Sequence, residues 1–136
     1  MAEYSLLTPT PVAVGAPIPF NNTIIRGCCN IRHRDGSGNI KVKGGTCCRP
    51  NRYYIQFHGN ITGVTATAQL GIYVDGELLP ETLMSVVEAD PANVLSIDSA
   101  TEIEVEGCYS TISVRVIAGT NATMQTANII IHREAA

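Results

Sequence analysis

The sequence contains few aromatic residues, few charged residues and no tryptophan. Only 5% of its 136 residues are aromatic, whereas 45% are hydrophobic, so a folded core must be mostly aliphatic. Charged residues make up 15%, against about 25% in typical soluble domains. This shortage predicts that part of the outer surface is buried against partner subunits.

No apolar run approaches the roughly 20 residues that a membrane-spanning helix needs. Residues 1–3 place an acidic side chain, Glu3, where a secretory signal requires a basic segment. We therefore expect synthesis in a cytoplasm and no membrane partner. The net charge of −3 lacks the positive footprint of a nucleic-acid-binding domain, so no nucleic-acid partner is expected.

Residues 53–74 carry the clearest pattern in the chain, YYIQFHGNITGVTATAQLGIYV. Apolar residues such as Ile55 and Phe57 alternate with polar ones over two runs that meet at a glycine. A period of two predicts extended strands with one buried face. Asp75-Gly76 then predicts a tight turn. From these runs we expect a long hairpin at the centre of the protein.

The rest of the chain repeats this pattern in shorter segments that glycine and proline separate. The whole chain holds 12 glycines and 7 prolines, and Asp35-Gly-Ser-Gly38 is a strong turn signal. No segment has the spacing of a helix. We predict one all-β domain over residues 12–136, an antiparallel jelly-roll sandwich of about eight to ten strands.

Residues 1–11, MAEYSLLTPTP, lack periodicity and hold two prolines that disfavour a helix or a central strand. We expect an extended N-terminal arm that attaches the protein to a partner surface. The attaching side chains would be Tyr4, Leu6, Leu7, Pro9 and Pro11. A frayed terminus without a role is the alternative.

The cysteines form two adjacent pairs, Cys28-Cys29 and Cys47-Cys48, spaced symmetrically about the turn at 35–38. A folded-back segment would place the pairs opposite each other. Three interpretations stay open: buried free thiols, disulfides within or between subunits, and a zinc site. The zinc site is the least favoured, because the usual C-x₂-C spacing is missing. We expect a cluster of reduced or partly oxidised thiols without metal, and Cys108 in the core.

No arrangement of residues indicates catalysis. The histidines lie on separate segments with polar neighbours, and no nucleophile elbow is present. They are His33, His58 and His132, which we expect at a surface or interface. Glu102, Glu104 and Glu106 share one solvated strand face. The sequence thus predicts no enzyme, no cofactor and no resident metal.

A modest basic patch is expected at the turn that follows residue 31. It consists of Arg32, His33, Arg34, Lys41 and Lys43. An exposed hairpin without a ligand is the favoured interpretation. A phosphate or glycan site is the alternative, although the chain has no Gly-rich loop between a strand and a helix there.

Four segments follow one pattern when taken together. They are GAPIPFNN at 15–22, YYIQFHGN at 53–60, YVDGELLP at 73–80 and ANIII at 127–131. The pattern resembles the TNF/complement-like jelly-roll domain found at the tips of exosporium collagen-like glycoproteins and in related phage virion proteins. The resemblance covers about residues 12–134.

The resemblance implies a compact homotrimer with apolar strands around its threefold axis, serving as a structural or adhesive surface module. The chain lacks the collagen-like stalk of the exosporium proteins, and the paired cysteines depart from the pattern. We therefore predict a bacteriophage virion protein, a trimeric capsid decoration or head-fibre protein that binds the major capsid protein or another shell protein through its arm. The alternatives are a spore-surface module and an adhesin that binds a host surface glycan.

Overall fold

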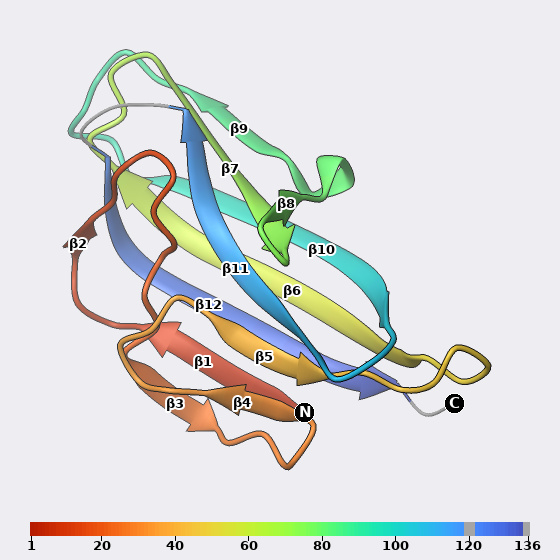
Figure 1. The fold of residues 1–136 in the computed structure, drawn as a ribbon. Helices are drawn as coiled ribbons and strands as arrows, with labels where there is room; N and C mark the ends of the chain where they lie inside the picture. The colour runs from red at the N-terminus through yellow and green to blue at the C-terminus, as the bar shows by residue number, and fades with distance from the viewer. Residues whose placement is uncertain (119–121, 135–136) are drawn as a thin grey trace.

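The computed structural model describes residues 1–118 and 122–134 of the chain. Over these ranges, twelve strands form two six-stranded antiparallel sheets that face each other (Figure 1). The predicted all-β antiparallel sandwich is confirmed. The strand count exceeds the expected eight to ten because several strands, such as β2 and β8, are only two residues long.

The first sheet runs in the order β10-β6-β12-β1-β3, with β2 also pairing with β12. Its strands are β1 (Ala2–Leu6), β2 (Thr10–Pro11), β3 (Asn22–Ile25), β6 (Asn51–Thr62), β10 (Leu95–Val105) and β12 (Thr123–Glu134). The second sheet runs β4-β5-β11-β7-β8, with β9 pairing with β7. Its strands are β4 (Ile31–His33), β5 (Ile40–Lys43), β7 (Thr67–Val74), β8 (Glu77–Leu78), β9 (Met84–Val87) and β11 (Tyr109–Ala118), and a 3₁₀ turn, η1 (Pro80–Thr82), precedes β9.

The core lies between the sheets and is mostly aliphatic, as the composition predicts. Along β6, Tyr53, Ile55 and Phe57 are fully buried and alternate with the exposed Gln56 and His58. β7 and β11 supply isoleucine, leucine and valine from the opposite sheet. Each such side chain contributes about 1.5–3 kcal/mol when it leaves water, so burial of these alternating faces drives the two sheets together.

The expected hairpin at residues 53–74 is wrong, because β6 and β7 belong to different sheets. β6 pairs with β10 and β12, whereas β7 pairs with β11, β8 and β9. The chain passes from one sheet to the other through residues 63–66, where Gly63 has a positive φ of 79°. Each strand buries one face in the core. The two strands therefore face each other from opposite sheets and are not hydrogen-bonded neighbours in one sheet. Alternation is the same for either arrangement, so it could not distinguish them.

The turn predicted at Asp75-Gly76 is confirmed. Asp75 and Gly76 have φ values of 52° and 85°, and Val74 pairs with Glu77 directly across the turn. The Asp75 backbone N–H donates to the Thr111 carbonyl over 2.8 Å, and its Oδ1 accepts from the Thr111 N–H over 2.9 Å. The turn is therefore fixed to β11 as well as closing β7 on β8.

The expected N-terminal arm is corrected, since its first half is an integral strand. β1 lies between β12 and β3, with Ala2 opposite Ile131 and Leu6 opposite Ala127. Tyr4 is 2% exposed, and Leu6 is buried as well. Ala2, Tyr4 and Leu6 form an alternating set, but five residues were too few to reveal it. The jelly-roll domain thus begins at residue 2 rather than at residue 12.

No helix in residues 1–118 and 122–134 is long and apolar enough to cross a membrane.

Candidate functional site

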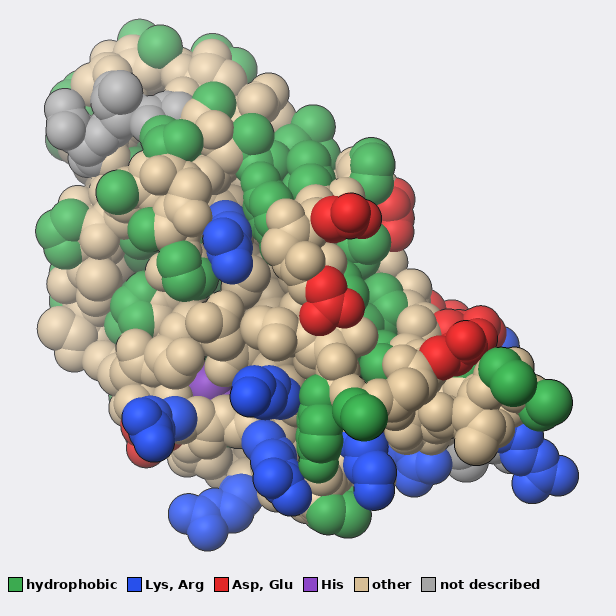
Figure 2. Space-filling model, viewed as in Figure 1, with side chains coloured by type: hydrophobic (Ala, Val, Ile, Leu, Met, Phe, Trp, Pro, Cys, Tyr) green, Lys and Arg blue, Asp and Glu red, His purple; other side chains and the backbone are tan. Residues whose placement is uncertain are grey.

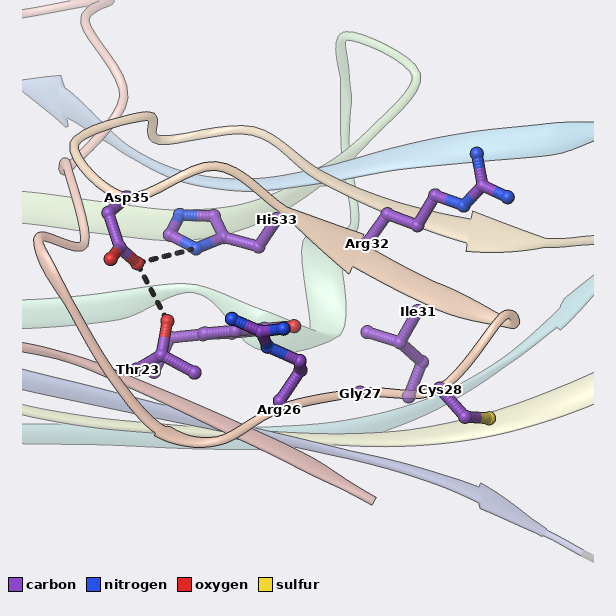
Figure 3. Close-up of a pocket in the computed structure, with 9 residues that line it drawn as sticks. Thr23, Arg26, Gly27, Cys28, Ile31, Arg32, His33 and Asp35 are labelled. Carbon is purple, nitrogen blue, oxygen red and sulfur yellow. Dashed lines mark hydrogen bonds and ion pairs between the residues drawn. The ribbon is translucent and has the colours of Figure 1, made fainter.

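A polar depression of about 400 Å³ opens at the edge of the sandwich, between β3 and β4 (Figure 3). It is lined by Tyr4, Thr23, Arg26, Gly27, Cys28, Ile31, Arg32, His33 and Asp35. Its size falls within the range of small-molecule sites. We refer to it as the edge pocket.

The edge pocket exists because β3 and β4 are consecutive but belong to opposite sheets. β3 pairs with β1, and β4 pairs with β5, so the chain crosses the sandwich between residues 26 and 30. Gly27 allows this crossing: a Cβ atom there would lie 2.7 Å from the Ile31 carbonyl oxygen and 3.2 Å from the Ala2 Cβ. A larger residue would force the crossing segment or its neighbours to shift.

His33 forms the inner wall of the edge pocket, with its side chain fully buried. Its ring lies against the Tyr4 ring, with centroids 4.4 Å apart. The Nε2 atom is 2.8 Å from the Ser37 carbonyl oxygen, and because a carbonyl only accepts, Nε2 carries the proton. The Nδ1 atom is buried and has no hydrogen-bond partner among the described residues. Such an orphaned atom calls for an explanation.

Asp35 stands at the mouth of the edge pocket and links its two sides. Its Oδ1 accepts a hydrogen bond of 2.6 Å from the Thr23 hydroxyl on β3. The same oxygen lies 3.9 Å from the His33 Nδ1 (Figure 3). The Asp35 side chain is 63% exposed, so it is held in position yet open to solvent. Burial is the main cause that raises the pKa of Tyr4, so this phenol is neutral at ordinary pH.

The two arginines of the edge pocket differ in direction. The Arg26 side chain extends across the space between its own segment and β4, whereas Arg32 points away (Figure 3). The Arg32 guanidinium instead lies over the Tyr109 ring, 5.6 Å from its centroid. No described residue accepts a hydrogen bond from Arg26 or forms an ion pair with it. Arg26 is therefore the cation that this pocket offers to a ligand.

The surroundings of the edge pocket are strongly basic. Residues 26–49 hold six lysines and arginines and one acidic residue, Asp35. Residues 53–114, in contrast, hold nine acidic residues and neither lysine nor arginine. Figure 2 shows lysine and arginine side chains gathered at the end of the molecule where β3, β4 and β5 lie. The basic patch predicted on this hairpin is thus present and continues to Arg26, which the sequence analysis did not include.

All five cysteines are free and exposed, so the expectation of buried thiols is wrong, including the core position expected for Cys108. The symmetric pairing assumed from their spacing does not occur. β4 and β5 pair Ile31 with Val42, whereas a register that set Cys28 opposite Cys48 would pair Ile31 with Gly45. Cys47 and Cys48 then lie in the turn beyond the strand, with their Sγ atoms 4.0 Å apart.

The cysteines nevertheless occupy the same end of the sandwich. The Lys43 N–H donates to the Asn30 carbonyl over 2.8 Å, and the Gly44 N–H donates to the Cys108 carbonyl over 2.9 Å. These bonds join the three segments that carry the thiols. No three His, Cys, Asp or Glu side chains in residues 1–118 and 122–134 are placed to hold a metal ion. Close approach of all four paired sulfurs stays a prediction.

The other residues singled out from the sequence lie on outer faces. His58 and His132 are exposed on the first sheet, as expected, whereas the His33 side chain is buried. Glu102 and Glu104 are exposed on β10, and Glu104 pairs with Arg52 at 2.8 Å. His33 could have been found by parity, because it lies two residues after Ile31 and strand side chains alternate.

No family model matches this chain, and no curated protein matches it. Solved structures match over nearly its whole length. The globular domain of zebrafish complement 1qA aligns with a TM-score of 0.68 at 11% identity, over 98% of each chain. The chain has a TNF/C1q-like jelly-roll fold. Eiger TNF from S. frugiperda aligns at 0.68 and 12% identity, over 99% of this chain and 93% of its own, and murine APRIL at 0.63 and 13%, over 96% and 97%. At these identities the likeness concerns the fold.

Proposed function

We propose that the protein is a non-catalytic structural module that assembles as a homotrimer on the outside of a particle or cell. The observation that carries this proposal is the outer face of the first sheet. Its centre, on β6 and the two strands beside it, is mostly polar and carries one charged side chain, Asp98, opposite His58, while Glu102 lies at its margin opposite Tyr54. The residues there are Tyr54, Gln56, His58, Asn60, Ser96, Asp98, Ala100, Thr126, Asn128 and Ile130.

Four polar side chains of this face, those of Asn60, Ser96, Thr126 and Asn128, are already hydrogen-bonded to neighbouring side chains. The Asn60 amide donates to the Thr126 hydroxyl over 2.9 Å and accepts from the Ser96 hydroxyl over 3.0 Å. The Asn128 amide donates to Glu3 over 2.8 Å. Satisfied polar groups cost less to remove from water than unpaired ones. The face is therefore suited to burial against copies of itself around a closed symmetry axis.

Trimer formation is tested by sedimentation of the purified protein at micromolar concentration. A stable folded monomer would refute the proposal. The variant Gln56→Glu places one charge per subunit at the centre of the face, and burying an unpaired charge costs several kcal/mol. We expect this variant to dissociate. The matched control, Ser85→Glu, adds the same charge to an exposed position on β9 of the other sheet and should remain trimeric.

Within this class we propose a bacteriophage virion protein, either a capsid decoration or a head-fibre protein, made in the host cytoplasm and displayed on the particle. Support comes from the sequence resemblance and from the trimer-competent face. A spore-surface module is the second candidate. Because Tyr4 and Leu6 are buried, attachment to a shell protein would use the exposed Leu7, Pro9 and Pro11.

Mass spectrometry of purified particles tests the virion proposal. Hundreds of copies per particle would indicate a decoration protein, and about a dozen a fibre or tail tip. Absence from particles, together with recovery from spore coats, would favour the second candidate. Replacing Leu7 by Asp should lower the copy number without changing sedimentation of the free protein, because Leu7 is exposed in the isolated chain.

A further inference from the structure

We propose that the edge pocket binds an acidic sugar residue, meaning a pyranose that carries a carboxylate. This site does not depend on the trimer or on the virion assignment. It is carried by three observations: an unpaired guanidinium at its mouth, a carboxylate held on the opposite side, and a buried imidazole with an orphaned nitrogen between the sheets.

The edge pocket presents both a cationic donor and anionic acceptors. Arg26 can donate two parallel hydrogen bonds to a carboxylate, the strongest arrangement available to a guanidinium. Asp35 uses Oδ1 for the Thr23 hydroxyl, which leaves its other oxygen for ligand hydroxyls. A plain anion would use only the arginine, and a neutral sugar would leave it unpaired. A ligand with both a carboxylate and hydroxyl groups satisfies both sides.

The His33 Nδ1 is a further atom of the edge pocket that a ligand could bind. With Nε2 donating to the Ser37 carbonyl, the Nδ1 of an uncharged ring is an acceptor. Asp35 is also an acceptor, and the two atoms lie 3.9 Å apart without a donor between them. Because the Asp35 side chain is exposed, its carboxylate can move aside enough to admit a hydroxyl. A sugar hydroxyl, which has one proton to donate, would supply the missing donor to the His33 Nδ1.

The walls of the edge pocket are fixed before a ligand arrives. The Tyr4 and His33 rings pack together, and Gly27 holds the crossing segment close to Ile31. Only the exposed Asp35 carboxylate is free to adjust. A preorganised site loses less entropy on binding than a mobile one. The volume of about 400 Å³ can accommodate one sugar ring with its substituents.

The surrounding charge selects for an acidic ligand. Asp35 offsets only one of the six lysines and arginines in residues 26–49, so the local field attracts anions over about a Debye length, roughly 8–10 Å at moderate salt. Arg34 and Lys41 line the adjoining depression on the other side of β4, which shares Arg32 and His33. An acidic polysaccharide chain leaving the edge pocket would therefore pass over further cations.

Binding is tested by NMR titration or calorimetry with four small probes. Methyl β-glucuronide and the methyl glycoside of N-acetylneuraminic acid carry a carboxylate on a pyranose, methyl β-glucoside is the neutral analogue, and acetate is the carboxylate without a sugar. We expect at least one acidic sugar to bind more tightly than both the glucoside and acetate. Equal binding of acetate or of the glucoside, or no binding of either acidic sugar, would overturn the proposal.

Variants place the site on the molecule. Arg26→Gln and Asp35→Asn should each weaken the acidic sugar roughly 10- to 100-fold, the range expected when one charged hydrogen-bonding partner is removed. Arg34→Gln, which removes one positive charge from the same hairpin outside the edge pocket, should change affinity less than about threefold. An equal loss in Arg34→Gln would mean non-specific charge attraction. Thermal unfolding of each variant checks that the fold is intact.

Cys28 provides an independent readout, since it lines the edge pocket and is exposed. Bound acidic sugar should slow alkylation of Cys28 in the wild-type protein. Cys47, which is exposed but lies outside the edge pocket, serves as the internal reference and should react at an unchanged rate. Unchanged alkylation of Cys28 at saturating ligand would place the ligand elsewhere and contradict the proposal.

Discussion

Single residues decide where this chain can turn, and Gly76 is the clearest case. Its φ of 85° lies in the left-handed region, which costs a residue with a Cβ roughly 1–2 kcal/mol. Gly76→Ala should lower the free energy of unfolding by about that amount, measured by urea denaturation. No atom lies within 4 Å of a Cβ built at this position, so the effect would report backbone conformation rather than a clash.

The exposure of the thiols leads to a second prediction at this scale. All five cysteines should react with iodoacetamide in the native protein, because all five side chains are exposed. Cys28 should react fastest near neutral pH. Its pKa is lowered, chiefly by hydrogen bonding with the Asn30 backbone, so a larger fraction is thiolate at a given pH.

Peptide mass spectrometry after brief alkylation measures each rate. Cys28 should react fastest from pH 6 to pH 8, and its advantage in rate should shrink at higher pH, once its own thiol is fully ionised. Protection of any cysteine in the reduced, folded protein would show that it is buried or bonded in solution. A disulfide in protein purified without reductant would instead favour the oxidised alternative raised from the sequence.

At the level of elements, the pairing of β1 on both sides predicts that deleting the N-terminal residues lowers the stability of the fold. A detached arm could be deleted without loss of stability, but Tyr4 is buried and β1 pairs on both sides. Tyr4→Ala should therefore cost about 3–5 kcal/mol, the range for removing a buried aromatic ring. Leu7→Ala, at an exposed position three residues later, should change stability by less than about 0.5 kcal/mol. Equal effects in chemical denaturation would refute the assignment of β1.

The edge of the first sheet gives a prediction about pH. The pKa of Glu102 is raised, first by its hydrogen bond with Glu134 and then by repulsion from that carboxylate. A carboxyl whose folded pKa lies above its unfolded value stabilises the fold when protonated, and this contribution is lost as the pH rises through the folded pKa. Glu102→Gln should raise the melting temperature at pH 7 and have little effect near pH 3.

Thermal melts of wild type and Glu102→Gln across this pH range make the comparison. Glu104→Gln is the matched control, because Glu104 pairs with Arg52 at 2.8 Å. Its removal should slightly destabilise the protein at pH 7, opposite in sign to the first variant. The same sign in both would mean that net charge, rather than the Glu102–Glu134 contact, sets the pH response.

For the whole molecule, the sequence predicts the fold class but not the partners of its strands. Alternation in residues 53–62 identifies the buried side of β6 correctly, because burial depends on parity alone. Whether β6 meets β7 beside it or across the core depends on where the chain turns at 63–66, and no local signal sets this. β1 was missed because three alternating apolar residues are too few to distinguish a strand from chance alternation.

The candidate site, like the strand pairing, could be predicted only in part from the sequence. Arg32, His33 and the turn at 35–38 were visible as a basic hairpin, yet the pocket needs Tyr4 and Thr23 from the other sheet. Those contacts arise only when β3 and β4 lie at one edge of the sandwich. The prediction that the cysteine pairs lie opposite each other was wrong for a related reason. Their spacing suggested a symmetric register, which the β4–β5 pairing does not adopt.

The pairing of the first and last strands has one more consequence. Because Ala2 lies opposite Ile131 on adjacent strands, the two ends of the described chain meet at one end of the sandwich (Figure 1). A short flexible linker could join them, and the exposed loop at 89–94 offers a place to open the chain instead. Such a circular permutant would keep every strand pair described above. Cargo fused at either end of this chain would project from the same side of each subunit, so an assembly could display it in one direction.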